Sequence, residues 1–150
     1  MRKLNEKQIV LASHNKGKLK EIGHLLKPFG ISVISASDLG LDEPEETENT
    51  YAGNARIKAH FAAKASGKPA LSDDSGFSVE ILDGAPGVYS ADWAETSNGR
   101  NFSMAMSKIW DKIQHAEKPC KAKFCCTLCL AWPDGHDELF EGSINGEIAW

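Results

Sequence analysis

The chain of 150 residues is long enough to bury a hydrophobic core, and 41% hydrophobic with 25% charged residues is the composition of a folded globular protein, not a disordered one. A formal net charge of −4 excludes the strongly basic surface with which proteins coat nucleic acid. No apolar run reaches the length of a membrane span, and no apolar signal core follows the basic residues 1–8, so we expect a cytoplasmic protein without a membrane partner.

The first predicted strand and helix enclose a polar segment. Residues 8–12 are a short apolar run that predicts a buried strand, and apolar residues at 19–26 recur at helical spacing. Ser13 or Asn15, between them, can cap the helix. Free N–H groups at the helix start and the charge of Lys18 predict a phosphate site, although a capped helix with a solvated lysine fits the same residues.

A second strand, an acidic loop and a second helix are predicted next. Residues 31–35 form the strand, and the acidic run at 42–48 is either a solvated loop or one that turns an acid inward as a metal ligand. The alanine-rich residues 50–65 predict a helix. Asn54 and Lys58 lie four residues apart and share a face of this helix, which can line a site or face water.

Two adjacent acids stand near the middle of the chain. Apolar residues 69–71 lead into the acidic segment 72–76, and apolar residues alternate at 77–82, which predicts a strand, a sharp acidic turn and a second strand. The neighbouring carboxylates of Asp73 and Asp74 repel each other, and a cation or a retained proton relieves the repulsion. The segment is therefore either a hard-metal site with a general base or a solvated hairpin turn.

The second half of the chain adds a loop, a helix and a hairpin. The glycine- and proline-containing residues 83–93 predict a loop that lets backbone approach a ligand. Residues 100–116 predict a helix whose apolar stripe faces the core. Residues 124–140 predict a hairpin around a turn at 133–135.

Four cysteines fall within ten residues of this region: Cys120, Cys125, Cys126 and Cys129. No second C-x-x-C pair or spaced histidine pair accompanies them, which argues against a zinc site. We expect reduced thiols on a buried strand.

Three motifs, in this order, resemble the inosine/xanthosine triphosphate pyrophosphatase family: the segment 13–18; Glu46-Thr47 with Asn54-Ala55 and Lys58-Ala59; and the segment 72–76 followed by 84–91. Members hydrolyse non-standard purine nucleoside triphosphates (dITP/ITP and dXTP/XTP) to the monophosphate and pyrophosphate, using magnesium. The resemblance covers residues 9–148. It implies an α/β fold, with a mixed, twisted central sheet flanked by helices in an elongated two-lobed molecule, a cleft between the lobes, and a homodimer.

The resemblance also implies roles for single residues. Glu46, Asp73 and Asp74 are implied to bind magnesium or manganese, and Asp74 is also the implied general base. The residues implied to bind the nucleotide are Ser13, His14, Asn15, Lys18, Asn54, Lys58, Ser75 and Gly76. No stable binding of nucleic acid is expected.

The chain departs from the family pattern at two places. Many relatives carry an arginine where this chain has Asp92, which affects a phosphate or dimer contact. The family's later base-binding motifs are not found, so we expect residues 1–150 to be a single domain that lacks the C-terminal segment, and base specificity cannot be inferred from it. The alternatives are a nucleotide pyrophosphatase of the septum-inhibitor type and a nucleotide-binding chain without turnover.

Overall fold

A computed structural model describes residues 1–150, which fall into two compact units. The first unit contains Met1–Asp74 and Thr127–Phe140, and the second contains Ser75–Cys126 and Glu141–Trp150. None of the helices is both long enough and apolar enough to cross a membrane.

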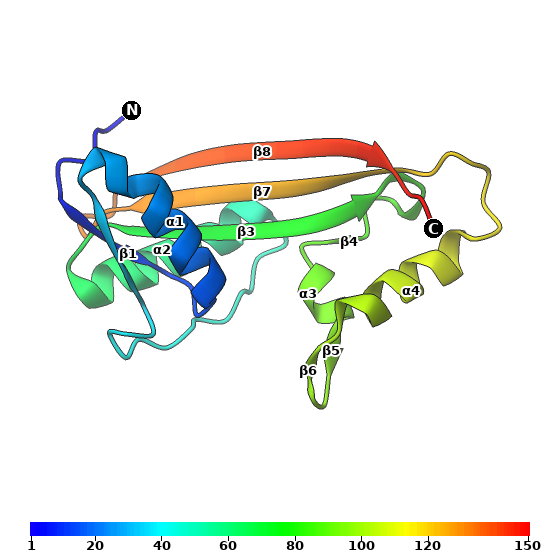
Figure 1. The fold of residues 1–150 in the computed structure, drawn as a ribbon, viewed down its shortest axis with the longest axis horizontal. Coiled ribbons are helices and arrows are strands. Elements are labelled where there is room, and N and C mark those ends of the chain that lie inside the picture. The colour runs from blue at the N-terminus through cyan, green and yellow to red at the C-terminus, as the bar shows by residue number, and fades with distance from the viewer. The chain divides into compact units, whose positions relative to one another are not determined.

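One mixed sheet with helices around it forms the predicted α/β fold (Figure 1). Its strands follow the order β2-β1-β3-β7-β8, and β4 pairs with β3. β1 (Gln8–Leu11) is parallel to both β2 (Ser32–Ser35) and β3 (Ala70–Val79), whereas β4 (Pro86–Gly87) is antiparallel to β3. The predicted hairpin is longer than expected and consists of β7 (Lys121–Ala131) and β8 (Asp137–Glu147).

The first unit adds α1 (Lys16–Leu26), the 3-10 helix η1 (Lys27–Phe29) and α2 (Tyr51–Ser66). Thr50 caps α2, and Gly67 ends it in the left-handed region at φ 70°. The alanines of α2 are small enough to let the helix lie close to the strands. The hydrophobic core of the first unit comprises Val10, Ala36, Ala55, Ala59, Ala62, Ala63, Ala70, Cys129 and Ala131.

The second unit contains η2 (Glu80–Leu82), α3 (Ser90–Trp93) and α4 (Phe102–Ile113). β5 (Glu95–Thr96) and β6 (Gly99–Arg100) form a small separate two-stranded sheet. Ile109 and Ile113 of α4 face the core of this unit, which also comprises Val79, Cys120 and Ala122, but Phe102 and Met106 of the predicted apolar stripe are exposed.

The predicted acidic turn is wrong, because β3 runs without interruption through Asp73 and Asp74. Successive side chains of a strand point to opposite faces, so the two carboxylates do not crowd each other as they would on a tight turn. Asp74 is buried and Asp73 is half-buried. The sheet therefore separates the two acids, and the strand ends only at Val79, where η2 begins.

The cysteines lie on or beside a strand that is buried only in part, whereas a buried strand was expected. All four thiols are free, and Cys129 is buried while Cys126 is exposed. They lie on or beside β7, and no group of three histidine, cysteine or acidic side chains there could hold a metal ion.

Candidate functional site

The start of α1 is closed by its own cap. The Oδ1 atom of Asn15 accepts the N–H groups of Gly17 at 2.9 Å and Lys18 at 3.2 Å, and the Asn15 N–H donates to the Ser13 hydroxyl at 3.0 Å. These two helix N–H groups are therefore not free, contrary to the prediction. What the segment offers to a ligand is the helix dipole, the exposed His14 and the charge of Lys18.

Two lysines from different helices reach the predicted acids. The Lys18 Nζ lies 2.5 Å from Asp73 Oδ2, and the Lys58 Nζ lies 3.1 Å from Glu46 Oε1. Lys58 also donates a hydrogen bond to the backbone carbonyl of Asp73. The structure thus brings together four of the predicted site residues, which come from α1, α2, β3 and the acidic loop.

Asp74 is the most unusual ionisable group of this cluster. The residue is 7% exposed, and its Oδ2 atom is buried without a hydrogen-bond partner. Burial raises the pKa of Asp74 from 3.8 to about 6, opposed by the Lys58 charge and an Asn54 hydrogen bond and reinforced by the charges of Glu46 and Asp73. A pKa near the working pH is the property that a general base needs.

Asn54 was predicted to bind the nucleotide, and a nucleotide ligand should have an accessible side chain. The Asn54 side chain lies in the site but is buried. It is 2% exposed, and both the oxygen and the nitrogen of its side-chain amide form hydrogen bonds with the backbone of Glu48. The remaining predicted residues, Ser75 and Gly76, belong to the second unit, where Ser75 is exposed and Gly76 is buried on β3.

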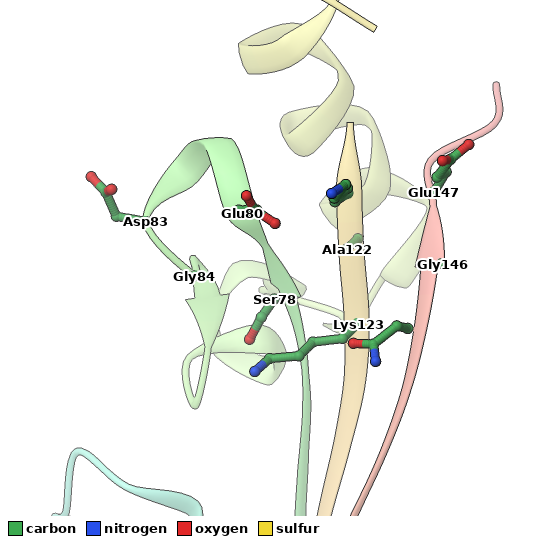
Figure 2. Close-up of a pocket in the computed structure, with 10 residues that line it drawn as sticks. Ser78, Glu80, Asp83, Gly84, Ala122, Lys123, Gly146 and Glu147 are labelled. Carbon is green, nitrogen blue, oxygen red and sulfur yellow. The ribbon is translucent and has the colours of Figure 1, made fainter. Parts of the chain in front are cut away.

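The second unit has a surface hollow of its own (Figure 2). Its lining includes acids such as Glu80 and Glu147 and lysines such as Lys123, and none of the predicted site residues takes part. This mixture of opposite charges matches no single ligand charge, so the hollow is not the candidate site.

The acids of the first unit suit a hard divalent cation chemically, although they do not form a ready-made ligand group. Glu46, Asp73 and Asp74 supply only oxygen donors, the ligand type that hard divalent cations such as magnesium prefer. No three acidic, histidine or cysteine side chains stand close enough together to hold a metal ion in this conformation, in which Lys18 and Lys58 pair with two of the carboxylates.

Sequence reasoning missed two contacts that support this site. The buried Ser72 hydroxyl donates to the carbonyl of Ala55 at 2.5 Å and ties β3 to α2 next to the acids. Gly53 allows the acidic loop to touch the start of α2. A glycine in the first turn of a helix otherwise rich in alanine was the available signal for the second contact.

Comparisons with known proteins agree with these motifs. The model of the family described as the Ham1 family matches residues 9–150. The chain is 60% identical over 144 residues to the dITP/XTP pyrophosphatase of Ruegeria pomeroyi, covering 95% of this chain and 71% of that protein. It is 56% identical to the dITP/XTP pyrophosphatase of Agrobacterium fabrum, covering 100% of this chain and 72% of that protein.

Solved structures show the same likeness. The HAM1 protein of Coxiella burnetii superposes with a TM-score of 0.88 at 34% identity, covering 96% of this chain and 74% of that one. The Ham1 protein of Staphylococcus aureus gives a TM-score of 0.85 at 34% identity, covering 95% and 72%.

Proposed function

Because the chain belongs to the Ham1 family, we propose that it hydrolyses non-standard purine nucleoside triphosphates, dITP/ITP and dXTP/XTP, to the monophosphate and pyrophosphate. Such a reaction removes abnormal nucleotides from the cellular pool. The observation that supports it most directly is the buried, unpartnered Oδ2 of Asp74 beside Lys58.

The reaction exchanges one P–O bond for another. The oxygen of a water molecule bonds to the α-phosphorus, the bond from that phosphorus to the pyrophosphate oxygen breaks, and the water loses a proton. Asp74 Oδ2 is the acceptor that we assign to this proton, because it is buried, has no hydrogen-bond partner and is largely ionised at neutral pH. Asp73 is less suited, since Lys18 holds one of its oxygens at 2.5 Å.

Positive charge must offset the charge of the triphosphate before water can approach. Lys18 and Lys58 supply it from the side of α1 and α2, and the positive end of the α1 dipole adds to it. Two lysines face the three carboxylates of Glu46, Asp73 and Asp74, which leaves net negative charge to attract a cation. Those three acids would hold magnesium or manganese, which would neutralise phosphate charge when bound.

Family resemblance further supports a cytoplasmic location and a homodimer. Equilibrium sedimentation tests the homodimer. A mass of twice 16.3 kDa is expected at micromolar concentration, and a single-chain mass would contradict this part of the proposal.

The test of substrate class compares nucleotides on one preparation. We expect pyrophosphate release from dITP and XTP in the presence of magnesium, with kcat/KM at least about 100-fold above that for dATP and dGTP. Equal turnover of all four nucleotides would contradict the proposed specificity. Absence of turnover with every triphosphate would contradict the activity itself.

A further inference from the structure

The acidic loop is attached to α2 by one side chain. The Glu48 N–H donates to Asn54 Oδ1 at 2.9 Å, and Asn54 Nδ2 donates to the Glu48 carbonyl at 3.1 Å. The amide thus pairs with the loop backbone much as a neighbouring strand would. Because Asn54 is 2% exposed and both ends of its amide are used, it is poorly placed to bind a nucleotide directly.

The loop also touches α2 at the preceding residue. A Cβ at Gly53 would lie 2.7 Å from the Glu48 Cβ, 2.8 Å from its Cγ and 2.9 Å from the Oγ1 of Thr50, the cap of α2. The Cβ cannot swing away as the tip of a flexible side chain can, so any larger residue at 53 must displace the loop backbone. Gly53 and Asn54 together form a seat for Glu48, and we use the term loop seat for these two residues.

The loop seat is close to two of the site acids, Glu46 and Asp74. Glu46 lies two residues before Glu48, and its carboxylate meets Lys58 one helical turn beyond Asn54. The Asn54 side chain also bonds to the carboxyl of Asp74. No regular secondary structure holds residues 41–48, and their five like charges repel one another, so the seat and the Lys58–Glu46 ion pair are what resist displacement of Glu46.

We propose that Asn54 is a positioning residue that, with Gly53, holds the acidic loop so that Glu46 stays paired with Lys58 at the site, and that it is not a nucleotide ligand. This inference rests on the proposed function, because it gives Glu46 a part in the same hydrolysis. The seat itself is a structural property that can be measured without any substrate.

Amide hydrogen exchange tests the seat. The Glu48 N–H is expected to exchange at least about tenfold faster in Asn54→Leu and in Gly53→Ala than in the wild type, because its acceptor is lost or displaced. Gly23→Ala is the matched control, since Gly23 is a helical glycine of α1 and an added Cβ meets no atom within 4 Å. Urea unfolding of each variant separates local loosening from global loss of stability. Unchanged exchange at Glu48 in folded variants would overturn the seat.

A double-mutant cycle on dITP hydrolysis tests the role. Gly53→Ala touches neither Asp74 nor substrate, and we expect it to lower kcat about 10–100-fold while KM changes by less than about threefold. In a Glu46→Gln background the same substitution should cost less than about threefold, because it acts through Glu46. Asn54→Leu should likewise lower kcat and leave KM nearly unchanged. In the Glu46→Gln background it should still lower kcat somewhat, because Asn54 also bonds to Asp74.

The outcomes separate the two proposals. A large rise in KM for Asn54→Leu would mean that Asn54 is a nucleotide ligand. Reductions in kcat that multiply fully with that of Glu46→Gln would mean that Asn54 is a purely structural residue that does not act through Glu46. If the wild type does not hydrolyse dITP, the proposed function fails and the positioning role fails with it. The exchange rate of the Glu48 amide then still shows independently whether Asn54 holds the loop.

Discussion

Asp74→Asn is expected to make the protein more stable and nearly inactive. The substitution keeps the shape of the side chain but removes its charge and its ability to accept the proton from water. A pKa of about 6 in the folded state, against 3.8 ordinarily, means that ionised Asp74 costs the folded protein about 2–3 kcal/mol. For a chain of this length, removing that cost should raise Tm by roughly 5–10 °C.

The pH dependence of this gain has a definite sign. Below pH 3.8 the carboxyl is protonated in both the folded and the unfolded chain, so its ionisation costs nothing. Between 3.8 and about 6 the unfolded chain has lost the proton and the folded one retains it, so the stability of the wild type falls as pH rises. The gain from Asp74→Asn should therefore be full above pH 7 and should vanish near pH 4.

Two measurements on the same sample check both effects. Urea unfolding of wild type and variant at pH 7.5 and at the acid end gives the stability difference, and pyrophosphate release gives turnover, which should fall by about 10²–10⁴. Nucleotide binding, measured by calorimetry, should survive. Asp73→Asn is the matched control, because it removes the partner of Lys18 and should bring no comparable gain. A destabilised Asp74→Asn variant that keeps wild-type turnover would refute the reasoning.

Three further predictions concern charge, metal and thiols. Lys18→Ala removes the proposed charge-assisted contact with the triphosphate, which is worth about 1.5–3 kcal/mol, so kcat/KM should fall roughly 10–100-fold. Unchanged steady-state kinetics would mean that Lys18 pairs with Asp73 and does not contact the nucleotide. A chelator should abolish turnover, and magnesium or manganese should restore it; activity that survives chelation would refute metal dependence. Elemental analysis should find no zinc. A thiol reagent should modify Cys126 first and Cys129 only after unfolding, because burial raises the pKa of Cys129 to about 12; one zinc per chain would contradict this.

The architecture of the chain was largely predictable from local patterns. Apolar runs predicted β1 and β2, the helical spacing of apolar residues predicted α1 and α4, and the alanine-rich residues 50–65 predicted α2. Capping chemistry predicted the start of α1 at Ser13 or Asn15, and Asn15 is the cap. Local patterns say less about strand length, and β8 continues to Glu147, well beyond the predicted Phe140.

The site was predictable only as a set of residues. The motifs named Lys18, Asp73 and Asp74, but Lys18 and Asp73 are 55 residues apart, and nothing in their own neighbourhoods predicts that they pair. The two acids resemble a turn because polar residues usually mark turns, whereas here the sheet places one of them in a buried position. Asn54 was predicted to bind the nucleotide because the sequence shows no partner for its side chain. Its partner is the backbone of Glu48, and a backbone partner can belong to any residue type, so the sequence does not reveal it.

The most direct test of the central claim is to follow dITP hydrolysis in ¹⁸O-labelled water and to identify the products by mass spectrometry. Attack of water on the α-phosphorus predicts deoxyinosine monophosphate carrying one ¹⁸O atom and an equal amount of unlabelled pyrophosphate. Label in the pyrophosphate, release of orthophosphate with a nucleoside diphosphate, or no turnover of dITP would contradict the account.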